Sequence, residues 1–357
     1  MDLNQLNSVL AGLPHPLLVV DSENRIRIAN DAARELLGSE PAERNYVAVI
    51  RQPGALDCIE NALRHRRRSE GRFMRAGAST ETTYRMVAIP LDRARSGLSG
   101  VIVSFEDISH VEEAEQMRRD FVANVSHELR SPLTALAGFI ETLRGAARND
   151  EAARDRFLTI MEREANRMNR LVSDLLSLTK VEVNERVRPR DLVDVIALIR
   201  STIAALRPLA ESAGAEIDLL AECDTATVAG DPDQLTQVIS NLIENGLKYG
   251  ASGGVVRVEA RIVQHFAGFR GPALRIDVID RGEGIDPVHI PRLTERFYRV
   301  DSHRSREKGG TGLGLAIVKH IINRHRGRFQ IQSERGHGST FSVILPIAET
   351  ADRNAGP

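Results

Sequence analysis

The chain has 357 residues, too many for one ordinary hydrophobic core, so its length predicts two or three domains. Lysine plus arginine number 48 and aspartate plus glutamate 49, a balance that gives no overall reason to expect nucleic-acid binding. The two cysteines, Cys58 and Cys223, form neither a CxxC pair nor a metal-ligand spacing, which favours a reduced compartment.

Apolar runs in the sequence are too short for a membrane helix. The strongest candidate, residues 193–206, is interrupted by Asp194 and Arg200. The N-terminal residues show no basic segment followed by an apolar one, so no signal peptide is expected. We therefore expect a cytoplasmic chain with no integral membrane segment, whose association with a membrane would depend on partners.

Residues 1–107 are expected to form a small α/β module. Two extended runs flank an Asp-Ser-Glu-Asn turn within residues 15–31, and residues 84–91 and 98–108 have the composition of further strands. The basic run at 64–69 is expected to be solvated surface, and a contact with a membrane face or a partner stays open.

From about residue 108 the apolar period becomes helical. Apolar side chains recur every three or four positions from Ile108 to Leu136, apart from the gap that spans Pro132, and again through residues 151–183. A polar connection containing Gly145 joins the two predicted helices. Because such a hairpin cannot bury its apolar stripe alone, residues 108–186 are expected to dimerise into a four-helix bundle.

Helix and strand signals alternate through residues 187–349, and a tail of residues 350–357 follows. Asp191 is expected to cap a helix that Gly214 ends. Strands are expected near 215–220, 225–229 and 274–280, a glycine loop and helix over 309–327, and a closing hairpin over 328–347.

The stretch "GDPDQLTQVISNLIENGLKYG" has the strongest helix start in the chain. Asp231 is the expected N-cap, Pro232 the first helical residue, and Gln234 can close a capping box. Asn241 and Lys248 share one flank of this helix. Amides in such places are most often satisfied polar groups, but an amide oxygen can ligate Mg²⁺ and an ammonium can meet a phosphate.

A histidine and a carboxylate precede a proline inside the first long helix. Pro132 cannot donate to the carbonyl of Glu128, so the helix is expected to bend or loosen there. His127 lies about 200° around the helix from Val125 and Leu129, away from the buried stripe. Its imidazole would be largely neutral and nucleophilic at pH 7, with Glu128 beside it to accept a proton.

By itself this pair is weak evidence for a nucleophilic site, because a lone histidine on a helix is most often an ordinary surface residue. A zinc motif of the form H-E-x-x-H is excluded, since Ser131 stands where the second histidine would be. The weight of the hypothesis therefore rests on the other motifs of the chain.

Three glycine-rich stretches suit a nucleotide. Asp280 ends a predicted strand and opens "DRGEGI", where a carboxylate can accept from the exocyclic amine of a base. "GGTGLGL" (309–315) offers backbone N–H groups and a helix start to phosphates, but it is neither a P-loop nor a Rossmann fingerprint. "GHGSTF" (336–341) alone could be a hairpin turn. Residues 295–310 fit a lid over phosphates and a disordered loop equally well.

Together these pieces resemble the sensor histidine kinases of two-component systems. "FVANVSHELRSPL" is similar to their phospho-acceptor box, "NLIENGLKYG" to the N box, "ERFYRVD" to the F box, and the three glycine stretches to the glycine boxes. The motifs span roughly residues 115–345 and are jointly highly specific. Residues 1–107 resemble a PAS sensor domain, and within the family the acceptor-box stretch is most similar to the phosphate-regulon branch.

The resemblance implies a multidomain fold. It consists of an α/β PAS-like sensor domain (1–107), a dimerisation and phospho-acceptor hairpin (108–186) that forms a dimeric four-helix bundle, and an α/β-sandwich ATP-binding domain of the Bergerat (GHKL) type (187–349). It implies ATP and Mg²⁺ as cofactors, a homodimer, and an aspartate of a response-regulator receiver domain as the acceptor of the phosphoryl group, in phosphate-type signalling.

The resemblance also assigns residues. His127 would take the γ-phosphoryl group of ATP with Glu128 as base, and Asn241 would ligate Mg²⁺. Asp280 would hold the adenine amine. The lid arginine is left open between Arg299 and Arg304. The remaining cofactor-binding positions would be Asn245, Lys248, Tyr249, Gly282, Gly284, Gly310, Thr311, Gly312, Leu313 and Gly314.

Some positions depart from the family pattern. Gly246 and Gly250 stand where alanine and threonine or serine are common, which predicts a looser helix end. Ser131 replaces a threonine or asparagine that usually helps position water, so phosphatase activity toward the response regulator stays open.

A nucleotide-binding sensor scaffold without phosphotransfer is the first alternative function for this chain, and a chaperone- or topoisomerase-like ATPase ranks below it. The absent membrane helices indicate a shortened form or a soluble relative.

Overall fold

The computed structural model describes residues 3–38, 40–76, 81–91, 99–185, 187–250, 254–301 and 310–348. Residues 302–309 of the predicted lid, which include Arg304, and the tail 350–357 lie outside these ranges. The chain divides into two compact units, Met1–Ala123 and Asn124–Pro357. Among the residues that are described, no helix combines the length and the apolar character needed to cross a membrane.

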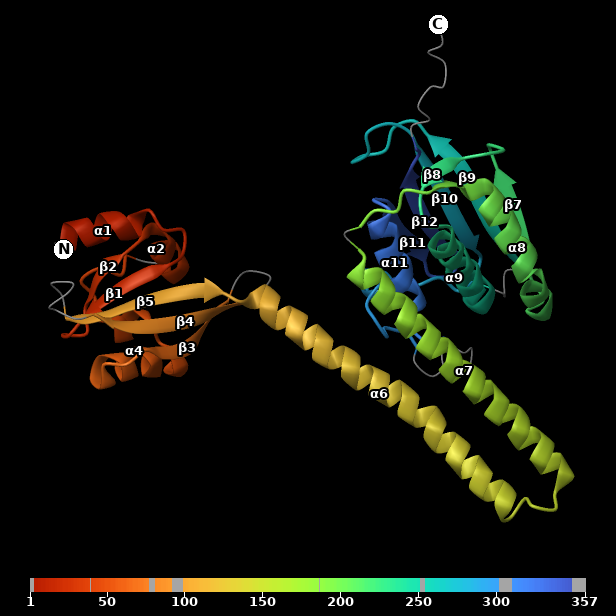
Figure 1. Cartoon of the computed structure of the whole chain (residues 1–357), viewed down its shortest axis with the longest axis horizontal. Helices are drawn as coiled ribbons and strands as arrows, with labels where there is room; N and C mark the ends of the chain where they lie inside the picture. Colours follow the sequence, from red (N-terminus) through yellow and green to blue (C-terminus); the bar gives the residue numbers. More distant parts are fainter. Residues whose placement is uncertain are drawn as a thin grey trace, which may run out of the picture. The chain divides into compact units, whose positions relative to one another are not determined.

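The N-terminal unit is built on one antiparallel sheet with the strand order β2-β1-β5-β4-β3 (Figure 1). Leu18, Ile59 and Phe105 belong to the main core of this unit, which unites strands with the helices that lie between β2 and β3. A smaller cluster joins Leu10 of α1 to Val19 of β1. The elements are α1 (Leu3–Ala11), β1 (Leu17–Asp21), β2 (Ile26–Ala29), α2 (Asp31–Leu37), α3 (Tyr46–Val49), α4 (Pro53–His65), β3 (Ser69–Ala76), β4 (Glu81–Leu91) and β5 (Gly100–Asp107).

The predicted strands of this unit are confirmed as β1, β2, β4 and β5. The sequence pattern did not locate β3, an edge strand that exposes most of its side chains. Its burial alternates from Ser69 to Phe73, but serine and glycine hold the first two less exposed positions, so the hydropathy does not alternate. The side chains of the basic run from Arg64 to Arg68 are exposed, as expected for a solvated surface.

The helical hairpin consists of α6 (Ser109–Arg144) and α7 (Glu151–Val183). The helix α6 runs through Pro132 without ending there. The helix α7 begins at a clear cap, where the Asp150 carboxylate accepts from the backbone N–H of Ala153 at 2.9 Å. Near the tip of the hairpin Phe139 stacks on Phe157, with ring centroids 5.3 Å apart.

The C-terminal domain is an α/β sandwich, as predicted. Within the described ranges its main sheet has the order β11-β12-β10-β9-β7, with β7 parallel to β9 and the other pairs antiparallel. Helix α8 packs on α9, and α9 packs on α11 beside the sheet (Figure 1). The elements are β6 (Leu192–Asp194), α8 (Val195–Ser212), β7 (Glu216–Ala221), β8 (Thr227–Ala229), α9 (Pro232–Gly250), β9 (Val255–Val263), β10 (Ala273–Asp280), η2 (Ile290–Arg292), α11 (Gly314–Arg324), β11 (Arg328–Glu334) and β12 (Gly338–Pro346).

The predicted start of α8 is wrong. Asp191 precedes the short strand β6, which pairs with β8, and the true N-cap is Asp194. Its carboxylate accepts from the backbone N–H groups of Ile196 at 3.1 Å and Ala226 at 3.2 Å, so it ties the helix start to the neighbouring segment. Gly214 follows the helix with φ +65°, in agreement with its predicted role as a terminator.

The start of α9 confirms one half of the predicted capping box and contradicts the other. The Asp231 carboxylate accepts from the backbone N–H of Gln234 at 3.2 Å. The N–H of Asp231, however, donates to Nε2 of His325 at 3.0 Å, and the buried Oε1 of Gln234 has no partner among the described residues. The imidazole at the end of α11 has taken the place of the glutamine, since its Nδ1 lies 2.7 Å from the Ile321 carbonyl oxygen and fixes the ring.

Acidification is expected to destabilise this corner of the domain. Burial lowers the pKa of His325, so the folded protein keeps the ring neutral, whereas the unfolded chain binds a proton near pH 6.5. The unfolded state therefore binds more protons below pH 6.5, and the free energy of unfolding falls as the pH drops. Hydrogen exchange of the α9 amides, corrected for intrinsic rates, should show less protection at pH 5.5 than at pH 7.5.

The matched control is His265→Gln, which removes an exposed histidine of the same domain and should keep this pH dependence. His325→Gln should lower protection at both pH values and flatten the difference between them. An undiminished pH dependence in His325→Gln would contradict the assignment.

Candidate active site

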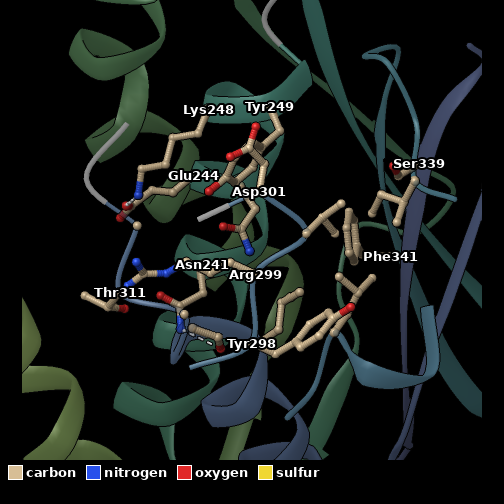
Figure 2. A pocket seen from close by; sticks show the side chains of 18 of the residues that line it. Asn241, Glu244, Lys248, Tyr249, Tyr298, Arg299, Asp301, Thr311, Ser339 and Phe341 are labelled. Carbon is tan, nitrogen blue, oxygen red and sulfur yellow. Dashed lines mark hydrogen bonds and ion pairs between the residues drawn. The ribbon is translucent and has the colours of Figure 1, made fainter. Parts of the chain in front are cut away.

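A cavity of about 380 Å³ lies in the C-terminal domain, a size that suits a cofactor (Figure 2). Its wall is made by α9, by the end of β10 and the glycine turn after it, by residues 298–301, by the loop before α11 and by part of α7. Most predicted site residues line it, namely Asn241, Asn245, Lys248, Tyr249, Asp280, Gly284, Arg299, Gly310, Thr311, Gly312 and Gly314.

The flank of α9 gives the cavity its amides and its ammonium (Figure 2). Leu235 and Leu242 bury the neighbouring stripe of this helix and thereby fix the flank toward the cavity. The Nδ2 of Asn241 donates to the Gly314 carbonyl at 3.3 Å, which turns the amide oxygen away from that carbonyl. The Nζ of Lys248 pairs with the Glu244 carboxylate at 2.9 Å.

Asp280 is a buried carboxylate in the cavity wall, and it lies against Gly250 at the last residue of α9. Its Oδ1 accepts from the backbone N–H of Gly282 at 2.9 Å. Gly282 does not line the cavity itself and acts through this bond. Burial raises the pKa of Asp280, and hydrogen bonds from Gly282 and Ser339 oppose that rise. Such a carboxylate suits the exocyclic amine of a purine base.

Two unusual glycines let α9 approach the sheet closely. A Cβ at Gly250 would lie 2.4 Å from the Cβ of Asp280, and a Cβ at Gly246 would lie 2.9 Å from Cγ1 of Val256. The helix nevertheless extends through Gly250. Gly250 therefore provides the space in which Asp280 stands, and Gly246 provides space for Val256 of β9.

Gly250→Ala is expected to displace Asp280 and to weaken ATP-analogue binding about 10-fold, because a small misplacement of a recognition group costs much of its interaction. Calorimetric titration with a non-hydrolysable ATP analogue measures this. Gly138→Ala is the control, since Gly138 also lies in a helix but has open space around its Cα. If Gly250→Ala binds the ATP analogue with unchanged affinity, the approach of Gly250 to Asp280 is not tight in solution.

The F box and the second glycine box are joined through their backbones. The N–H of Phe297 donates to the Gly312 carbonyl at 2.8 Å. Both residues have positive φ, +64° and +73°, and a Cβ at Gly312 would lie 3.0 Å from the Phe297 Cα. Leu313 is fully buried and does not line the cavity, so its role is to anchor the start of α11.

His127 and Glu128 lie on α6 in different surroundings. His127 is exposed, as predicted, and does not line the cavity. The Glu128 carboxylate is half-buried and pairs with Arg167 of α7 at 2.7 Å and with Arg299 at 3.2 Å. The Ser131 hydroxyl donates to the His127 carbonyl at 3.1 Å.

Sequence reasoning missed the contribution of α7 to the site. Arg170 and Asp174 line the cavity, and the Thr311 hydroxyl donates to the Asp174 carboxylate at 2.6 Å. Burial raises the pKa of Asp174, and the Thr311 bond opposes that rise. The sequence did contain a signal for a buried, functional Asp174. This carboxylate falls at helical spacing between Leu171 and Leu178, which are both buried.

Two family models match the chain. Residues 117–184 match the His Kinase A (phospho-acceptor) domain, and residues 230–349 match the histidine kinase-, DNA gyrase B-, and HSP90-like ATPase. A solved structure of the histidine kinase ThkA in complex with the response regulator protein TrrA aligns over 96% of this chain and 98% of its own, with 20% identity and a TM-score of 0.51, a likeness of fold.

Curated relatives align over nearly the whole chain. The phosphate regulon sensor protein PhoR of Pseudomonas aeruginosa is 35% identical over 361 residues, which cover 98% of this chain and 76% of PhoR. The sensor protein kinase WalK of Staphylococcus saprophyticus is 33% identical over 98% of this chain, which spans 57% of WalK. With the acceptor helix, the sandwich domain and its cavity in place, the chain belongs to the sensor histidine kinases.

Proposed function

We propose that the chain transfers the γ-phosphoryl group of ATP to His127. The observation that carries this is the polarity of the cavity. The buried carboxylate of Asp280 lies against Gly250, at the last residue of α9, whereas the glycine loop contacts Arg299 at Gly312 and Asn241 at Gly314, about 13 Å back along α9. The first of these places suits the amine of adenine and the second suits phosphate oxygens. The exposed imidazole of His127 then serves as nucleophile and Glu128 as the base that takes its proton.

The oxygen donors at the cavity fit a magnesium ion. Asn241 offers an amide oxygen, and Mg²⁺ in nucleotide sites is held by one or two protein oxygens together with phosphates and water. When bound, the ion would neutralise charge on the phosphate oxygens. No cluster of histidine, cysteine, aspartate and glutamate side chains in the described ranges could hold a metal without the nucleotide.

The hairpin supports a homodimer and a receiver-domain partner. The helices α6 and α7 expose an apolar area that a second copy could cover. Between 45 and 68% of the residue surface is exposed at Leu133, Ile140, Leu158 and Leu176. The phosphoryl group would pass from His127 to an aspartate of a response regulator.

Likeness to PhoR supports phosphate-type signalling, and the use of ATP supports a cytoplasmic site. A phosphatase reaction would rest on Ser131.

The N-terminal unit is proposed as a PAS-like sensor domain. Its fold supports this, because one antiparallel sheet carries helices between its second and third strands in sequence. The proposed domains span residues 1–107, 108–186 and 187–349.

Incubation of the chain with γ-labelled ATP and Mg²⁺ tests the kinase proposal. The expected product carries an acid-labile, alkali-stable label that peptide mapping places on His127. Nucleotide binding without any label, in the full chain and after deletion of residues 1–107, would overturn the proposal in favour of a nucleotide-binding sensor scaffold.

A further inference from the structure

Glu128 is shared between two arginines that come from different parts of the C-terminal unit. Arg167 of α7 approaches it at 2.7 Å, whereas the two Arg299 contacts are longer, 3.2 and 3.5 Å. The Arg167 side chain is 11% exposed and the Arg299 side chain 6% exposed. Arg167 therefore holds the carboxylate within the hairpin, and Arg299 is the weaker and more exchangeable partner.

Arg299 is also part of the cavity wall (Figure 2). Its Nε is buried and has no hydrogen-bond partner among the described residues. A guanidinium offers five N–H donors in a fixed fork that matches phosphate oxygens in two-point contacts. The ion pair with Glu128 thus leaves one buried N–H donor of Arg299 unsatisfied within the described ranges. Because this side chain faces the cavity, the unsatisfied donor points to an anionic ligand there.

A second carboxylate of the hairpin stands at the same end of the cavity. Asp174 accepts from the Thr311 hydroxyl in the glycine loop at 2.6 Å. Both groups that the hairpin carboxylates engage, Arg299 and Thr311, belong to the end of the cavity assigned to phosphates. A triphosphate there would meet Asp174 and Glu128 as like charges and would compete with Glu128 for Arg299.

We propose that Arg299 exchanges partners between Glu128 and the phosphates of a bound nucleoside triphosphate. In the arrangement described above, Glu128 occupies Arg299 in place of a phosphate, and arginines hold both of its oxygens. Arg167 and Arg299 share Oε2, and Arg299 alone reaches Oε1, so only the departure of Arg299 frees an oxygen for the proton of His127. Binding of the triphosphate draws Arg299 away and loosens the contact between the catalytic domain and the hairpin. Glu128 keeps Arg167, which positions it beside His127. This exchange rests on the proposed function.

The affinity of the full chain for a non-hydrolysable ATP analogue with Mg²⁺ tests the exchange. Glu128→Gln removes the competing charge, so it should bind the analogue about 10-fold more tightly than the unmodified chain, within the usual range of coupling between two events. Glu164→Gln is the matched control. Its carboxylate lies 3.6 Å from Arg167, and no ion pair joins it to Arg299 among the described residues, so its affinity should not change.

Equal affinities of Glu128→Gln and the unmodified chain would overturn the exchange while leaving the nucleotide site intact. The same gain in Glu164→Gln would overturn it too, because general charge would then explain the effect. If the unmodified chain does not bind the analogue, the proposed function itself fails.

A crosslink measures the contact between hairpin and catalytic domain directly. Ser177 of α7 lies against Gln237 of α9, with 2.7 Å between Oγ and Oε1, and neither residue lines the cavity. Cysteines at these two positions, with Cys223 changed to serine, should be joined by a short bismaleimide in the nucleotide-free chain. The ATP analogue with Mg²⁺ should slow crosslinking several-fold, and adenosine, which lacks phosphates, should not. Unchanged crosslinking in the chain with bound analogue would overturn the exchange.

Discussion

His127→Gln is expected to reduce phosphoryl incorporation from γ-labelled ATP to background. Glutamine has no nitrogen that can act as a nucleophile, so the covalent product cannot form. Binding of an ATP analogue should be unchanged, because the His127 side chain is exposed and does not line the cavity. Label incorporation and calorimetric titration on the same preparation measure the two properties.

The control for this variant is another histidine on the same helix. The His110 side chain is 97% exposed on α6, and His110→Gln should incorporate label at the rate of the unmodified chain. Acid-labile label that persists in His127→Gln would show that a different histidine is the acceptor.

Asp280→Asn is expected to lower the affinity for ATP about 100-fold, or about 2.8 kcal/mol. One carboxylate oxygen accepts from the Gly282 backbone, so an asparagine that keeps this bond turns its NH₂ group toward the cavity. Two donors, the amide and the exocyclic amine of adenine, then face each other in a buried place. Calorimetric titration with an ATP analogue measures the loss.

Asp286→Asn serves as the control, because Asp286 is an exposed carboxylate six residues further along the same segment. Its affinity should equal that of the unmodified chain. An Asp280→Asn variant that folds and binds the analogue with undiminished affinity would remove Asp280 from base recognition.

Local sequence pattern predicted the wall of the cavity well, because each part lies in one short segment. The flank of α9 follows from helical spacing between Asn241 and Lys248, and the glycine loops follow from composition. The pattern failed where partners are far apart in sequence. The pair of Glu128 with Arg299 joins positions 171 residues apart, and the bond between Asp231 and His325 spans 94.

Those misses have a common physical cause. A capping box or a helix flank is specified by neighbours within one or two turns, so its geometry can be predicted from spacing alone. The partner of a buried group across a packed interface depends on how whole elements dock. His325 displaced Gln234 from its expected bond because the end of α11 packs against the start of α9.

That junction also determines which helix ends face the nucleotide. The end of α11 meets the start of α9, so the opposite ends of both helices lie at the cavity, where Gly314 begins α11 and Gly250 completes α9. The partial positive charge of the α11 macrodipole therefore stands by the glycine loop, and the partial negative charge of α9 stands beside Asp280. The backbone alone thus imposes a field across the cavity that favours phosphates at the first end and an amine at the second.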